Sequence, residues 1–388
     1  MPFRVLIKLS LLAILSVGLK AQASLWKSQN AWNEEFEKKY SAWIVSSVPS
    51  TFFKEINIAT DCADAPIITR LVFARENSLP AGVSSGSGRI ISNLSSGWDS
   101  YPTAANWKED KRFLKAIVDI INSTNSKTLY QDTYPVLLNS KYLVPGTMFI
   151  NATQTSGHAE WISKVSFDGM QAPLMFNSST VPQIVRDLLV YPFMKIKWPV
   201  KGDNGFVKFR WAVESGGSVS LKSAASMPGF SNEQYELSKT ENMDFDDFVT
   251  TRLIGHPLDG VHKLQILASH LTERFENRVP VVVDGFKVCG GGKCVKESSK
   301  FYDHSTYSRD GAIIFIIQGI FDLLYSDRYL NVDDQTAGQM TLHWSQLQTD
   351  VTVDIEGRPH ALGELVGIWN QALFSSDPND TIQKRWGF

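Results

Sequence analysis

Cysteine, long apolar runs and surplus charge are scarce in this sequence. Only three of its 388 residues are cysteines. Beyond the first 23 residues no run of about 18 apolar residues appears, so we expect no helix that spans a membrane. The 38 basic and 40 acidic side chains nearly cancel, leaving a formal charge of −2. That balance lacks the basic surplus typical of nucleic-acid-binding proteins, so we expect no nucleic-acid partner.

The amino terminus has the pattern of a signal peptide. Arg4 and Lys8 form a basic start, "LLAILSVGL" is a short apolar middle, and residues 21–23 (Ala-Gln-Ala) form a small-x-small cleavage site. We therefore predict that residues 1–23 are a signal peptide and that the protein is exported, to a periplasm or to the cell exterior. Disulfides persist in such an oxidising compartment.

Two of the three cysteines lie close together. Cys289 and Cys294 flank Gly-Gly-Gly-Lys in "VCGGGKCV". The glycines let the chain double back, so we predict a disulfide between these two residues. The alternative, two free or metal-seeking thiols, has no Cys-x-x-Cys or nearby histidine pair to support zinc. We expect no metal and no cofactor, and Cys62 is then the unpaired cysteine.

Cys62 precedes a stretch with helical periodicity, in "TDCADAPIITRLVFARENSLPA". Asp61 is a good N-cap residue, which would place Cys62 at the first helical position. Backbone N–H groups and the positive end of the helix favour a thiolate there. A thiolate nucleophile needs a histidine as base and a third group that orients the histidine. The alternative is a small, buried structural thiol.

Among seven histidines, His158 has suitable surroundings. It begins the alternating segment "GHAEWISKV", and "APLMFNSS", which ends near Asn177, reads as the neighbouring antiparallel strand. Cross-strand neighbours come within side-chain reach, so Asn177 is the candidate orienting residue for His158. Two alternatives stay open: His158 as an ordinary strand histidine, and Asn177 as a surface residue in an Asn-x-Ser pattern.

These residues carry a resemblance to a known superfamily. The order of the Cys62 helix, "VPGTMFI" and "GHAEWI" resembles the papain-like cysteine hydrolases, above all their NlpC-like branch of bacterial cell-wall peptidases and amidases. The segment around Cys62 is also similar to the "DCEDYA" helix of transglutaminase-like proteins. The resemblance implies a papain-like core, in which the cysteine-bearing helix packs on an antiparallel sheet, with an insertion between Cys62 and His158. It also implies amide-bond cleavage, with peptidoglycan peptides as substrate.

The second half carries no resemblance. "GFVKFRWAVESGGSVSLKS" predicts a hairpin with its turn at Gly216 and Gly217, and helical periodicity follows from about residue 244. "AIIFIIQGIFDLL" is apolar nearly all round and predicts a central core helix. We place a domain boundary near residue 200, at "KWPVKGDNG", which separates a papain-like domain (24–200) from a hairpin followed by a mainly helical part (201–388).

The sequence thus predicts an α+β fold and an exported cysteine hydrolase with a Cys62-His158-Asn177 triad that acts on peptides or peptidoglycan. Two alternatives remain: a non-catalytic exported binding protein on a papain-like scaffold, and an acyl transferase of the transglutaminase-like type. The sequence leaves the oligomeric state open.

Overall fold

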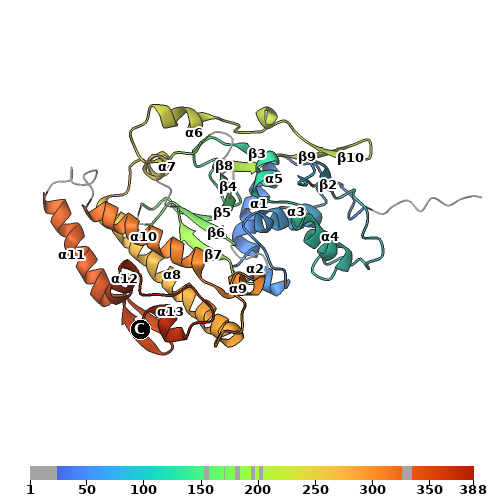
Figure 1. Cartoon of the computed structure of the whole chain (residues 1–388). Helices are drawn as coiled ribbons and strands as arrows, with labels where there is room; N and C mark the ends of the chain where they lie inside the picture. Colours follow the sequence, from blue (N-terminus) through green and yellow to red (C-terminus); the bar gives the residue numbers. More distant parts are fainter. Residues whose placement is uncertain are drawn as a thin grey trace, which may run out of the picture.

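The fold is α+β, with an antiparallel central sheet (Figure 1). The structure is a computed structural model. The predicted signal peptide lies outside the described residues. Those residues are 24–152, 157–169, 171–179, 184–193, 197–200, 204–325 and 334–388.

Six strands form the central sheet in the order β3-β8-β4-β5-β6-β7, and every neighbouring pair is antiparallel. Side chains alternate between its two faces, as pleating requires. The strands are β3 (Thr133–Pro135), β4 (Met148–Ala152), β5 (Gly157–Val165), β6 (Leu174–Ser178), β7 (Leu189–Pro192) and β8 (Asn204–Phe209).

Helices from the amino-terminal third form a layer at one side of this sheet. The first of these helices begins after Asn33, whose side-chain oxygen accepts a hydrogen bond from the Phe36 N–H at 2.9 Å. Helix α3 packs on α1 and α4, while α1 and α5 make direct contacts with the sheet at β4 and β5. All of these elements share one hydrophobic core. The helices are α1 (Glu34–Ser47), α2 (Phe52–Glu55), α3 (Asp64–Glu76), α4 (Lys111–Ile121) and α5 (Ser126–Gln131).

Helix α3 carries a buried charge that fixes its position. Its residues from Asp64 to Ala74 are all buried. Arg70 donates to Glu37 of α1 at 2.6 Å, and its guanidinium lies 3.4 Å from the Trp32 ring centroid. Glu37 also accepts from the Trp211 indole at 2.9 Å. This arrangement ties α1, α3 and the segment after β8 together.

The other face of the sheet is aromatic. Phe149 and Phe206 from adjacent strands lie 5.1 Å apart between ring centroids, and Phe176 and Phe193 lie 5.6 Å apart. Phe245 of α7 (Phe245–Ile254) covers Phe149 and Phe206 at about 6 Å. Helix α7 therefore belongs to the core of the sheet.

The predicted hairpin turn is confirmed, but its first strand lies elsewhere. β9 (Ala212–Ser215) pairs with β10 (Ser218–Leu221) across Gly216 and Gly217, whose φ angles of 58° and 76° suit glycine. β8, however, lies inside the central sheet, between β3 and β4. β1 (Gly82–Ser84) and β2 (Ile90–Ser92) form a second small ribbon.

The hydrophobic cores divide at another position in the chain than the boundary predicted near residue 200. The first hydrophobic core runs through β8 and α7 to Val249, and the second begins at Leu264 of α8. The division therefore falls between α7 and α8, after the left-handed Gly255. Short helical turns lie between β10 and α7: η1 (Ala224–Ser226), α6 (Glu233–Glu236) and η2 (Leu237–Lys239).

The carboxyl-terminal part packs around the long helix α8, as Figure 1 shows in orange and red. The predicted core helix, α10, buries only one side: Ile313, Ile317 and Ile320 are buried, whereas Phe315 is 59% exposed. The elements are α8 (Gly260–Cys289), α9 (Ser299–His304), α10 (Tyr307–Tyr325), α11 (Asp334–Asp350), β11 (Thr352–Ile355), β12 (Arg358–Ala361), α12 (Leu362–Asn370) and α13 (Ile382–Trp386).

The predicted disulfide is confirmed at the end of α8. Cys289 and Cys294 are bonded, with their Cα atoms 4.9 Å apart, and both are buried. The side chain of Asn379 accepts from the Cys294 N–H and donates to its carbonyl, each at 3.0 Å. The disulfide loop is thereby attached to the segment that leads into α13. Within the described part of the chain, no helix is both long and apolar enough to cross a membrane.

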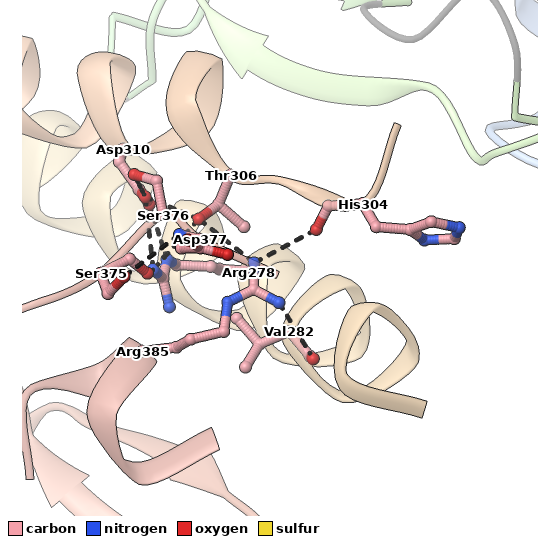
Figure 2. A network of polar contacts seen from close by, with 9 residues as sticks. All are labelled: Arg278, Val282, His304, Thr306, Asp310, Ser375, Ser376, Asp377 and Arg385. Atoms are coloured by element: carbon pink, nitrogen blue, oxygen red, sulfur yellow. Dashed lines mark hydrogen bonds and ion pairs between the residues drawn. The ribbon is translucent and has the colours of Figure 1, made fainter. Parts of the chain in front are cut away.

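A buried polar network holds α8 and α10 to the carboxyl-terminal segment (Figure 2). Arg278 of α8 is fully buried, and it donates to Asp310 at 2.6 Å and to the Ser375 carbonyl at 3.0 Å. Asp310 also accepts from the hydroxyls of Thr306 at 2.6 Å and Ser376 at 2.5 Å. Each member is held by more than one partner, so the network fixes the relative position of the segments.

Breaking this network should destabilise the carboxyl-terminal part. We expect Arg278→Met to cost about 3–5 kcal/mol in the free energy of unfolding, because Asp310 would keep a buried charge without its cation. Urea unfolding measures the loss. Lys287→Gln on the same helix is the matched control, because its side chain is 70% exposed, and it should leave the transition unchanged. A loss under about 1 kcal/mol for Arg278→Met would contradict a stabilising role.

Candidate active site

Cys62 lies in the turn that precedes α3, two residues before the first helical residue, Asp64. This corrects the expectation that Cys62 itself begins the helix. Its sulfur is half-buried and lies 3.7 Å from the carbonyl oxygen of Gly157, the first residue of β5. The thiol therefore faces the beginning of the strand that carries His158.

The helix end next to Cys62 is occupied by a carboxylate. Asp61 accepts from the N–H groups of Ala63 at 2.8 Å and Asp64 at 3.0 Å, while the Asp64 side chain accepts from the Asp61 N–H at 2.9 Å. The N-cap position of α3 is Ala63, so the expectation that Asp61 is the N-cap residue is wrong. Asp61 instead binds, from two residues further back, the N–H groups that were expected to stabilise a Cys62 thiolate. Burial, and then the neighbouring Asp61, raise the pKa of Asp64 to about 7.

A pair of hydroxyls attaches the Cys62 turn to the sheet. The Oγ of Ser179, directly after β6, lies 2.9 Å from Thr60 Oγ1 and donates to the Thr60 carbonyl at 2.5 Å. Thr60 lies two residues before Cys62, so these bonds hold the turn against the end of β6. The cysteine is thus positioned both by its helix and by the strand next to β5.

His158 is the second residue of β5, and three groups surround its ring. Nε2 lies 3.0 Å from Ser178 Oγ and 3.5 Å from Glu160 Oε2. Burial alone would lower the pKa of His158, but a hydrogen bond with Cys62, and then a hydrogen bond and the charge of Glu160, outweigh burial and raise the pKa to about 9. The ring is therefore held next to the thiol and favours its protonated state.

The register of β6 places Ser178, and not Asn177, at the histidine. Asn177 pairs with Trp161, so it shares the face of the sheet that carries Ala159 and Trp161. His158 and Glu160 alternate with those residues and lie on the opposite face. Ser178 is one position further along β6, which brings its side chain to that same face. The expected orienting role of Asn177 is accordingly not supported by the described hydrogen bonds of His158.

Sequence reasoning missed Glu160 and Ser178. Glu160 is 1% exposed and lies two residues after His158, so strand alternation alone was a signal that both side chains share a face. Ser178 had no comparable signal, because a one-residue change of register moves every side chain to the other face. The pairing of β5 with β6 is needed to choose between Asn177 and Ser178.

A cavity of about 370 Å³ adjoins the histidine. His158 and Ser178 form part of its wall at the sheet, and Arg274 of α8 and Arg309 of α10 lie on the helical wall. Cys62 is not one of the residues that line it. The histidine of the proposed dyad therefore contacts the cavity.

Comparison of the chain with protein-family models, curated proteins and solved structures gave no match. The chemistry of the site therefore has to be inferred from its own geometry.

The raised pKa of His158 predicts a pH-dependent contribution to stability. The folded state holds this proton more tightly than the unfolded state, whose histidine pKa is near 6.5. We expect the stability advantage of wild type over His158→Gln to be full below pH 6.5 and to disappear as the pH rises to about 9. Chemical unfolding at several pH values measures it. His343→Gln on α11 is the control, and an advantage that grows with pH would contradict the assignment.

Proposed function

We propose that this protein is a cysteine hydrolase of amide bonds, in which Cys62 is the nucleophile and His158 is the general base and acid. The observation that carries the proposal is the position of the half-buried Cys62, whose sulfur lies 3.7 Å from the carbonyl oxygen of Gly157, directly before a histidine that is itself held by Ser178 and Glu160. A nucleophile, a base and groups that orient the base are the parts that such chemistry needs.

The reaction follows from these positions. His158 already carries its proton at neutral pH, so Cys62 acts as the thiolate beside this imidazolium, and the sulfur attacks the amide carbonyl carbon to form a C–S bond. When the tetrahedral intermediate collapses, the C–N bond breaks and His158 gives its proton to the leaving amine. Water then hydrolyses the thioester, which releases the acid and restores the thiolate and the imidazolium.

The proposal changes two roles expected from the sequence. Nε2 of His158 is the ring nitrogen that contacts Ser178 Oγ and Glu160 Oε2. Ser178 and Glu160 thus take the orienting role expected of Asn177. Because Asp61 engages the Ala63 and Asp64 N–H groups, we assign the N–H of Cys62 itself as the backbone donor for the developing oxyanion.

We also propose a papain-like core, export of the protein and peptidoglycan peptides as its substrate. A cysteine before a buried helix and a histidine at the start of an adjacent strand are consistent with a papain-like core of the NlpC-like type. The bonded Cys289 and Cys294 are consistent with export to an oxidising compartment. The resemblance to the NlpC-like branch makes peptidoglycan peptides the substrate to test first.

Selective alkylation tests the dyad before a substrate is known. We expect Cys62 in the folded wild type to react with iodoacetamide faster at pH 7 than in the urea-unfolded chain, because His158 supports the thiolate. His158→Ala should slow the reaction about 100-fold. Mass spectrometry of the Cys62 peptide measures it, and His343→Ala is the control. Equal rates in the folded and unfolded chain would favour a non-catalytic scaffold.

The same variants test turnover on peptidoglycan peptides. Cys62→Ala and His158→Ala should both abolish release of the amine, while the melting temperature of Cys62→Ala stays close to that of wild type because the thiol is half-buried. Product analysis with an added amine separates hydrolysis from acyl transfer, which would share the thioester step. A sharp fall in melting temperature for Cys62→Ala would instead indicate a structural thiol.

A further comparison tests the orienting groups. Glu160→Gln removes a negative charge next to His158, so the pKa of His158 should fall below its wild-type value. The pH dependence of the rate of Cys62 alkylation reports this change. Ser178→Ala should slow alkylation without that shift. Asn177→Ala, which changes the adjacent residue on the opposite face, should do neither. The largest effect in Asn177→Ala would restore the triad expected from the sequence.

A further inference from the structure

The cavity next to His158 has a composition that the proposed hydrolysis does not explain. It lies between β5–β7 of the sheet and helices α8 and α10, which run beside those strands in Figure 1. Its volume of about 370 Å³ is within the range of small-molecule sites. Cys62 does not line the cavity, whereas His158 and Ser178 do.

Most of the wall is apolar. Leu267 of α8 and Ile316 and Leu323 of α10 form the helical side, and Leu189 and Tyr191 of β7 form the side at the sheet. Phe315 also lines the cavity, although it lies on the exposed side of α10 and its side chain is 59% exposed. This lining suits a ligand with an apolar body.

Two arginines place positive charge at the same wall. The Nε atoms of Arg274 and Arg309 are buried and have no hydrogen-bond acceptor among the described residues. Burial, and then the neighbouring cations Arg186 and Arg274, lower the pKa of Arg309. A guanidinium nevertheless keeps its charge at neutral pH. Unmet donors of this kind are costly unless a ligand supplies the acceptors.

The nearby acids do not neutralise this charge. Arg274 interacts with Glu160, but the nearest acid to Arg309, Asp310, is bonded to Arg278. The one carboxyl group among the described residues of the lining is Asp246, and burial, followed by the charge of Asp247, raises its pKa to about 6. Of the two arginines, Arg309 therefore has less neutralising negative charge near it.

We propose that this cavity binds a carboxylate attached to a short apolar body, with Arg309 and Arg274 as the carboxylate partners. A guanidinium matches a carboxylate with two parallel hydrogen bonds, and the apolar wall receives the rest of the ligand. The carboxyl terminus of an apolar peptide and a medium-chain fatty acid both have this chemistry. The inference goes beyond the proposed hydrolysis, because binding needs no reaction at Cys62.

Calorimetric binding to matched pairs of ligands tests the proposal. The pairs are N-acetyl-leucyl-leucine with its carboxamide, and octanoate with octanamide. Cys62→Ala protein is used, so that no amide is consumed. We expect at least one carboxylate to bind about 10-fold or more tightly than its amide, as a charge-assisted hydrogen bond predicts. The carboxylate with the lower dissociation constant shows whether the cavity binds a peptide carboxyl terminus or a fatty acid.

Variants at the arginines complete the test. Arg309→Gln in the same background should remove the preference for carboxylate, and Arg274→Gln should reduce it, while Arg309→Lys should keep part of it. Lys287→Gln, an exposed cation on α8, is the control. If Arg309→Gln does not fold, Arg309→Lys and the comparison of each carboxylate with its amide still test whether the cavity binds a carboxylate. No binding by either carboxylate, or equal binding of each carboxylate and its amide, overturns the inference without affecting the test of Cys62.

Discussion

The buried ion pair between Arg70 and Glu37 is the constraint on which the position of the site depends. A charge in the middle of a buried helix requires a partner, and Arg70 finds it on α1 at 2.6 Å. Glu37 in turn is held by the Trp211 indole and lies 3.4 Å from the Lys208 ammonium of β8. Because α3 is thereby fixed relative to α1 and the sheet, the turn that carries Cys62 meets the start of β5.

The second constraint on the site is the edge of the sheet at which β5 begins and β6 ends. Strand alternation places His158 and Glu160 on one face, and the pairing of β5 with β6 adds Ser178 to it. The Thr60 and Ser179 hydroxyls then join the helical side of the site to the strand side. The thiol and the imidazole meet because two independent restraints, one in the helical layer and one in the sheet, end at the same place.

Local features of this fold were predictable, whereas features set by pairing over long distances were not. The helix after Asp61, the turn at Gly216 and the disulfide each depend on a few adjacent residues. The insertion of β8 between β3 and β4 depends on strand order, and the choice of Ser178 over Asn177 depends on register. Neither strand order nor register can be read from a single sequence.

The division into two cores has a consequence for the order in which the protein is made. The segment that forms the first core ends at Val249, and the same segment carries the thiol, the imidazole and the sheet wall of the cavity. The opposite wall comes from α8 and α10, which are synthesised later. A nascent chain that has reached only α7 therefore carries the reactive pair beside an unenclosed surface, and the cavity exists only once translation has passed α10.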